Sequence, residues 1–141
     1  MRPLPGKGAC VPGQLNGINA ITLFVSDLAR SKTFYAKVLR GRVIFEDTES
    51  VVFDAGNTML NLLVSRGAVE LITPAPVAAP GDPSRSLFSF FVDDADAECA
   101  RLTEAGVDLL NGPIDRPWGK RTAAFADPDG TVWEVAQDLP S

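Results

Sequence analysis

The chain contains two copies of one strand-and-helix pattern, and this internal repeat constrains its fold more than any other feature. In residues 18–64 an alternating strand is followed by a helical segment and three short strands, and the same order returns in residues 86–137. Residues 1–17 and 65–85 are rich in Pro and Gly, which disfavours a long regular element in either segment. The pattern predicts a flexible tail at 1–17, a linker at 65–85 and a single α+β domain at 18–137.

Each copy has one helix with which to cover one sheet, so the fold class that we predict is two tandem βαβββ modules that bury their helical faces together. The modules are expected to form a curved mixed-sheet cup with the helices on its outer face. Each helix should begin after an aspartate cap and end at a glycine in the left-handed backbone region. These positions are Asp27, 28–40 and Gly41 in the first copy, and Asp94, 95–105 and Gly106 in the second.

The second copy is longer than the first before its final strand. The two copies are offset by 67 residues at their first strands and by 73 residues at their last strands, so the second copy has six additional residues. We expect this surplus in residues 111–119, as a long loop that carries Arg116 and Trp118. Trp118 then either stacks on a ligand at the rim of the cup or packs beneath its own loop.

Composition excludes several partners. The formal net charge of −5 and the pI near 4.6 argue against nucleic acid, because affinity for phosphate backbones comes mainly from clustered Lys and Arg. No apolar run approaches the roughly 20 residues that a membrane helix needs, and the first residues lack the apolar stretch of a secretory signal. We therefore expect a cytoplasmic protein with neither nucleic acid nor membrane as a partner.

Several reactive residue types have structural explanations. Tyr35 lies on the apolar face of the first helix, and Cys99 lies on that of the second, so both are expected in the core. Cys10 falls in the tail and is expected to be exposed. Residues 127–130, Asp-Pro-Asp-Gly, are typical of a turn, and we do not interpret the two aspartates as a catalytic pair.

Four segments of the chain resemble the vicinal oxygen chelate superfamily, which includes glyoxalase I, bleomycin-resistance proteins, fosfomycin-resistance enzymes and extradiol dioxygenases. They are residues 21–28, 31–35, 90–94 and 125–134, and the likeness extends over about 18–137. The resemblance implies the fold of paired βαβββ modules. It also implies a homodimer with the cup at or near the contact between the two copies. One fold hosts many functions, so the likeness does not identify a reaction.

In metal-dependent members of this superfamily the ligands come from the first and last strands of each module. The resemblance maps those positions onto Ala20, Asn61, Leu87 and Glu134. A catalytic transition-metal site usually needs about three protein ligands, commonly including imidazole. Here only Glu134 is a good ligand, Asn61 offers an amide oxygen, and the chain contains no His. We therefore expect no metal and no other cofactor.

Strand alternation from these four positions predicts the residues that line the cup. With the rim residues, the candidate ligand contacts are Thr22, Phe24, Met59, Asn61, Leu87, Ser89, Phe91, Trp118, Arg121 and Glu134. A mostly apolar lining with a few polar points suits a small, partly aromatic organic molecule. The sequence thus predicts a metal-free small-molecule binding protein, which sequesters a drug or a metabolite. Glu134 either braces the site and contacts the ligand or acts as a general acid or base. The alternative function is accordingly a glyoxalase-, isomerase- or dioxygenase-like enzyme that uses Glu134.

Overall fold

The computed structural model describes residues 15–141. The predictions for residues 1–14, including Cys10, fall outside the described residues. Within residues 15–141, no helix is both long and apolar enough to cross a membrane.

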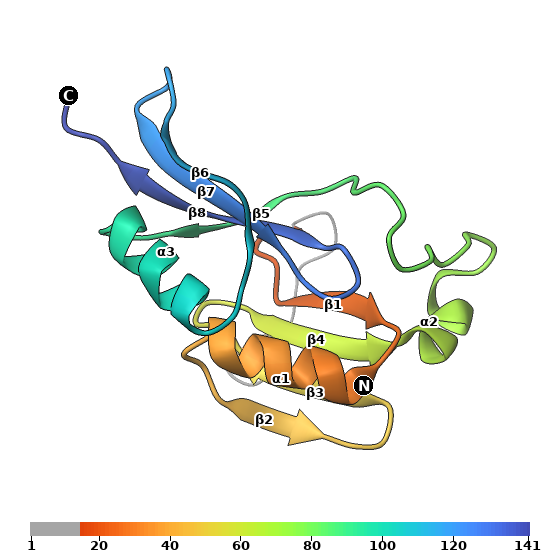
Figure 1. Cartoon of the computed structure of the whole chain (residues 1–141). Helices are drawn as coiled ribbons and strands as arrows, with labels where there is room; N and C mark the ends of the chain where they lie inside the picture. Colours follow the sequence, from red (N-terminus) through yellow and green to blue (C-terminus); the bar gives the residue numbers. More distant parts are fainter. Residues whose placement is uncertain (1–14) are drawn as a thin grey trace.

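The described chain consists of two βαβββ modules, which confirms the predicted α+β fold (Figure 1). The first module consists of β1 (Ala20–Val25), α1 (Leu28–Val38), β2 (Val43–Glu46), β3 (Ser50–Asp54) and β4 (Met59–Val64). The second consists of β5 (Phe88–Phe91), α3 (Ala95–Glu104), β6 (Leu109–Asp115), β7 (Lys120–Ala126) and β8 (Val132–Asp138). Sheet A has the order β1-β4-β3-β2 and sheet B the order β5-β8-β7-β6, so the two sheets repeat one topology. In each sheet the first and last strands of the module pair in parallel, and the other pairs are antiparallel.

The two module helices begin where the sequence predicts. Asp27 accepts a hydrogen bond from the Arg30 backbone N–H at the start of α1, and Asp94 caps α3 in the same way. Gly106 has a φ of 91°, as predicted for the residue after α3. The prediction for Gly41 is wrong, because α1 ends at Val38 and Gly41 is not among the glycines with positive φ.

Gly41 has a different reason to be glycine. A Cβ atom built on it would lie 1.7 Å from the carbonyl oxygen of Asp54, where no side chain fits. The absence of a side chain therefore lets the backbone before β2 approach the end of β3, and this contact closes the far edge of sheet A.

Two of the loops predicted from the sequence contain regular structure. The first eight residues of the predicted linker form α2 (Ser65–Ile72), whose Ala68 is fully buried. The predicted long loop at 111–119 is largely strand: β6 and β7 have seven residues each, whereas their counterparts β2 and β3 have four and five. The six surplus residues thus lengthen a hairpin and carry its turn away from the body of the sheet (Figure 1).

The helix-covered faces of both sheets share one hydrophobic core. Phe34 on α1 contacts Phe125 on β7, with ring centroids 6.4 Å apart, so the helix of the first module lies against the sheet of the second. Arg101 on α3 donates hydrogen bonds to the carbonyl oxygens of Lys37 and Val38 at the end of α1. Because the core occupies the helix-covered side of each sheet, the opposite face of each sheet is open and is directed away from the other.

A buried hydrogen-bond network joins the modules inside this core. Tyr35 donates its phenolic proton to Asp127 Oδ2 at 2.5 Å and accepts a hydrogen bond from Trp133 Nε1 at 3.0 Å. Asp127 Oδ1 accepts the backbone N–H groups of Asp129 and Thr131, which confirms that residues 127–130 form a turn. The predicted burial of Tyr35 and Cys99 is also confirmed. These groups stabilise the contact between the modules and are enclosed in the core.

Candidate functional site

The open faces of the two sheets carry equivalent polar pairs at their parallel strands. In sheet A, Thr22 is opposite Asn61, and Asn61 Nδ2 donates to Thr22 Oγ1 at 3.4 Å. In sheet B, Ser89 is opposite Glu134, and the Ser89 hydroxyl donates to Glu134 Oε2 at 2.8 Å. The second pair is the stronger one because its acceptor is a carboxylate at ordinary hydrogen-bond distance.

Asn61 has an unsatisfied buried atom. Its side chain is 7% exposed, and Oδ1 has no hydrogen-bond partner within residues 15–141. Leaving a buried acceptor unpaired costs free energy, on the order of 1–3 kcal/mol. A hydrogen-bond donor brought to the open face of sheet A would therefore gain an acceptor that is already desolvated.

Sheet B combines its polar pair with exposed apolar surface. Phe91, next to Ser89 on the same face of β5, is 81% exposed, and Leu87 just before this strand is 52% exposed. The ammonium of Lys120 lies 5.1 Å from the centroid of the Phe91 ring and forms an ion pair with Asp138. An aromatic ring left this exposed beside a cation is a ready contact for a planar ligand.

The tip of the long hairpin extends this face. Arg116 donates from Nε to the Thr122 hydroxyl at 2.9 Å and from Nη2 to the Asn111 amide oxygen at 3.3 Å, which fixes the guanidinium over β6 and β7. The Trp118 ring lies 5.9 Å from this guanidinium and is 66% exposed. Trp118 is therefore not packed beneath its own loop, and its indole is accessible at the rim of sheet B.

Arg121 lies on the other face of β7. Its guanidinium forms ion pairs with Asp115 at 2.6 Å and with Asp96 of α3 at 3.0 Å, on the helix-covered side of sheet B. The hydrogen bond with Arg121 lowers the pKa of Asp115, and the same contact raises the pKa of Arg121. The cations on the open face are instead Lys120 and Arg116. Alternation along β7 is the sequence signal for this, because Lys120 and Thr122 share one face and Arg121 has the opposite one.

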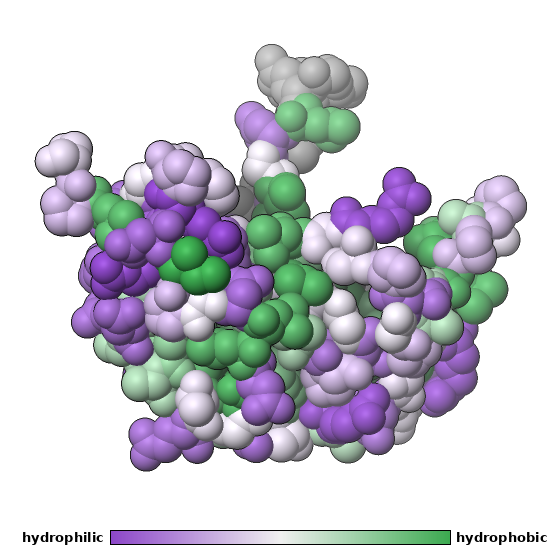
Figure 2. All heavy atoms as spheres, turned by 45° about the horizontal axis from the view of Figure 1, so that its top comes forward, coloured by the Kyte–Doolittle hydropathy of each residue, from purple (hydrophilic) through white to green (hydrophobic). Residues whose placement is uncertain are grey.

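The single chain divides the predicted contacts between two surfaces. Those on the open face of sheet A are Thr22, Phe24, Met59 and Asn61, and those on or beside the open face of sheet B are Leu87, Ser89, Phe91, Trp118 and Glu134. Figure 2 shows a band of hydrophobic residues between hydrophilic regions on one side of the molecule. The hydrogen bond of each set joins residues of the same sheet, so the predicted contacts lie on two separate surfaces of the chain.

The donor atoms on these faces do not fit a transition-metal site. Of the four superfamily ligand positions, Ala20 and Leu87 carry no donor, and the Glu134 carboxylate is already engaged by Ser89. Within residues 15–141, no three His, Cys, Asp or Glu side chains come together in a cluster that could hold a metal ion. A single carboxylate and a single amide on two different sheets fall short of the usual ligand set.

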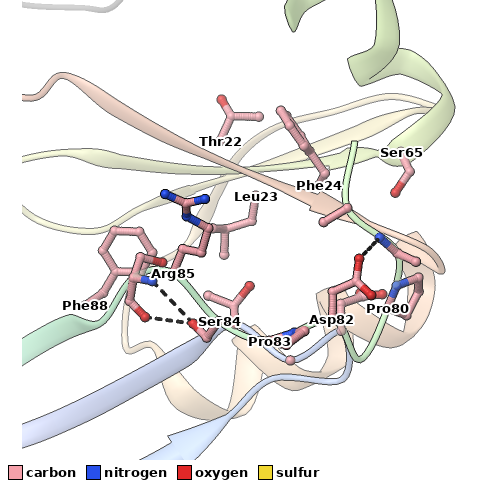
Figure 3. Close-up of a pocket in the computed structure, with 16 residues that line it drawn as sticks. Thr22, Leu23, Phe24, Ser65, Pro80, Asp82, Pro83, Ser84, Arg85 and Phe88 are labelled. Carbon is pink, nitrogen blue, oxygen red and sulfur yellow. Dashed lines mark hydrogen bonds between the residues drawn. The ribbon is translucent and has the colours of Figure 1, made fainter. Parts of the chain in front are cut away.

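A separate pocket of about 370 Å³ lies at the free edge of β1 (Figure 3). Its walls are β1, the segment 78–86, the start of β5 at Phe88 and the turn at 129–131. In Figure 3, Leu23 points into this space, whereas Thr22 and Phe24 leave β1 on the opposite side. We call it the β1-edge pocket. Sequence reasoning missed it, since the path of a Pro-rich segment over a strand edge leaves no periodic signal.

Comparison with known proteins agrees with this geometry. The family model described as "Glyoxalase/Bleomycin resistance protein/Dioxygenase superfamily" matches residues 17–135. The uncharacterised protein YraH of Bacillus subtilis (strain 168) is 33% identical over 123 residues, which cover 84% of this chain and 96% of that protein. The metallothiol transferase FosB of Staphylococcus saprophyticus is 24% identical over 127 residues, which cover 86% of this chain and 76% of that protein. A crystal structure of a glyoxalase/bleomycin resistance protein/dioxygenase from Nocardioides has a TM-score of 0.79 at 23% identity, with 93% of this chain and 89% of that chain covered.

Proposed function

The chain belongs to the glyoxalase/bleomycin resistance protein/dioxygenase superfamily, and on this basis we propose that it binds a small organic molecule on the open face of sheet B without a metal ion. The observation that carries the proposal is the Ser89–Glu134 hydrogen bond beside the exposed ring of Phe91. A partly aromatic ligand gains contact area from this ring and a polar anchor from the carboxylate.

The charges on this face favour a ligand with two different polar ends. Glu134 provides a carboxylate near the centre of the sheet, and Arg116 provides a guanidinium nearer the hairpin tip. Arg116 is hydrogen-bonded to Thr122 of β7, which pairs with Ala136 of β8. Ala136 lies two residues beyond Glu134, so the two charged groups are separated by roughly 7 Å along the sheet. A hydrogen-bond donor or cation on one end of the ligand suits Glu134, and an acceptor or anion on the other suits Arg116.

A second copy of the chain completes the site in this proposal. The open face of sheet A has the unpaired Asn61 Oδ1, and the open face of sheet B has the exposed apolar groups, but within one chain these faces are directed apart. In a homodimer the sheet A face of one copy covers the sheet B face of the other. This arrangement buries Phe91 and brings both polar pairs around one ligand.

Glu134 also supports the second candidate function, an enzyme of the glyoxalase, isomerase or dioxygenase type. Ser89 donates to Oε2, and Oε1 has no hydrogen-bond partner among residues 15–141, so Oε1 is available to contact a bound molecule as a general base would. Binding and catalysis differ in one measurable outcome. A binding protein returns its ligand unchanged, whereas an enzyme converts it in a manner that Glu134→Gln abolishes.

The test is a thermal-shift screen of aromatic antibiotics and metabolites, followed by calorimetry of the hits with folded variants. Trp118→Ala removes a large apolar contact and should weaken binding by about 1–3 kcal/mol, roughly ten- to a hundredfold. Val69→Ala is the matched control, because Val69 is an exposed apolar residue on α2, away from sheet B. Glu134→Gln should weaken the binding of ligands that carry a cation or a hydrogen-bond donor. Glu104→Gln on α3 is its control.

The expected result is a loss of affinity in Trp118→Ala and Glu134→Gln and none in the two control variants. Unchanged affinity in both test variants would contradict the proposal and move the ligand site elsewhere. Analysis of the ligand after incubation with the unmodified protein separates the two functions, because only an enzyme yields a product.

A further inference from the structure

The β1-edge pocket lies against backbone groups that are left without a strand partner. β1 is the edge strand of sheet A and pairs only with β4 within the described residues. The carbonyl of Asn19 accepts a hydrogen bond from the N–H of Met59 in β4, so the backbone groups of Asn19 face β4. Backbone groups alternate between the two edges of a strand, so those of Thr22 and Phe24, three and five residues later, face the free edge. Amide N–H groups along this edge are therefore available to a molecule in the pocket.

The acidic side chains of the pocket are already engaged. The Asp82 carboxylate accepts the backbone N–H of Ala79 at 2.9 Å. The Asp129 carboxylate accepts both the backbone N–H and the hydroxyl of Ser26, the latter at 2.6 Å. Both carboxylates thus stabilise the walls of the pocket.

The cation that lines the pocket, by contrast, is unpaired. Arg85 has no hydrogen bond or ion pair with any other residue between 15 and 141, and its side chain extends from the segment 78–86 toward β1 (Figure 3). A guanidinium and the edge amides of β1 are thus the donors that this pocket offers.

The rest of the lining is apolar. Leu23 and Phe88 form its inner wall, and Pro80 and Pro83 form part of the outer one. The volume of about 370 Å³ is at the lower end of the range for small-molecule sites. We propose that the β1-edge pocket binds the carboxylate group of a small organic acid with an apolar body, and that Arg85 is its anchor.

The charge count favours a monocarboxylate over a phosphate. One free guanidinium balances a single negative charge, and a guanidinium matches a carboxylate through two parallel hydrogen bonds. A dianion would meet only one cation, with Asp82 and Asp129 nearby and a net charge of −5 on the chain. This site is independent of the proposed site on sheet B, so either one can fail without the other.

Benzoate, with benzamide as its uncharged counterpart, is the probe for this pocket. Titration of ¹⁵N-labelled protein should give saturable shifts at β1 and residues 78–86 with a Kd on the order of 1 mM, ordinary for a ligand of this size. Arg85→Gln should lower the affinity for benzoate at least about tenfold and leave the weak affinity for benzamide unchanged. Arg66→Gln is the matched control, since Arg66 is also exposed, lies on α2 and does not line the pocket.

Three outcomes would overturn the proposal. The first is the absence of saturable shifts at about 50 mM benzoate, far above the expected Kd. The second is an equal effect of Arg85→Gln and Arg66→Gln, and the third is a set of shifts confined to the open face of sheet B.

Discussion

Replacement of Tyr35 by Phe tests how the two modules are held together. The substitution removes one hydroxyl from a fully buried position and keeps the ring that packs against Phe34 and Trp133. It leaves the buried Asp127 carboxylate without its hydrogen bond at Oδ2, and it leaves Trp133 Nε1 without an acceptor. Both losses fall at the contact between α1 and sheet B.

The expected destabilisation follows from these two losses. A hydrogen bond to a charged group contributes about 1.5–3 kcal/mol, and an unsatisfied neutral donor costs about 1 kcal/mol, so Tyr35→Phe should lower the free energy of unfolding by about 2–4 kcal/mol. This is a large share of the stability of a small domain, roughly 5–15 kcal/mol. Trp133→Phe removes only the second hydrogen bond, but it also shrinks a buried ring, so Phe34→Leu serves as a control for lost aromatic packing.

Urea unfolding followed by circular dichroism measures these differences. The reasoning would be refuted if Tyr35→Phe lowered the free energy of unfolding by less than about 0.5 kcal/mol, which is the size expected for an ordinary surface substitution. That outcome would mean that water replaces the hydroxyl or that Asp127 is not essential to the contact between modules.

The same residue predicts a pH dependence. Burial, followed by the nearby Asp127 carboxylate, raises the pKa of Tyr35 far above its ordinary value of 10.0. The native state therefore resists ionisation of this phenol, and its contribution to stability is complete below about pH 10 and is lost as the pH rises further, by about 1.4 kcal/mol per unit. Tyr35 is the only tyrosine in the chain, so tyrosinate absorbance should appear only with unfolding. Tyr35→Phe should not show this part of the loss of stability at alkaline pH. Tyrosinate formation in the folded protein near pH 10 would contradict the account.

Two further predictions concern the metal and the dimer. Elemental analysis after incubation with zinc, nickel, manganese and iron(II) and then desalting should find no stoichiometric metal, and about one metal per chain lost in Glu134→Gln would contradict this. In the proposed homodimer, Ala20→His with Leu87→His should raise metal affinity, because sheet A of one copy covers sheet B of the other; a folded, dimeric double variant that binds metal no better would contradict this arrangement. Light scattering at micromolar concentration should give twice the 15.0 kDa chain mass, and Phe91→Asp should shift the protein toward monomer because it charges the covered face. A monomeric unmodified protein would refute the two-chain site.

Much of the fold could be predicted from the sequence because local signals and the repeat agree. Asp27 and Asp94 cap the helices as expected, and alternation from Thr22 and Ser89 gives the correct open faces of β1 and β5. Each of these predictions depends on a short-range period that side-chain burial enforces. The prediction for Gly41 failed because its requirement comes from a distant backbone contact and not from its own helix.

The candidate site was harder to predict, since it depends on how elements meet. Arg121 was assigned to the site from its position near Trp118, but its ion pairs with α3 fix it on the opposite face. The role of Arg116 depends on a hydrogen bond to Thr122 across a hairpin whose length the loop prediction missed. The divergence of the two open faces could not be predicted either, because the packing of α1 on sheet B is a contact between modules.

The central claim is that a metal-free ligand binds on the open face of sheet B. A crystal structure of the protein with a hit from the ligand screen, combined with metal analysis of the same crystals, tests it most directly. The account predicts ligand density against Phe91 within hydrogen-bond distance of Glu134, covered by sheet A of a second copy and without a metal ion. A metal ion coordinated by Glu134, or a ligand bound away from sheet B, would contradict it.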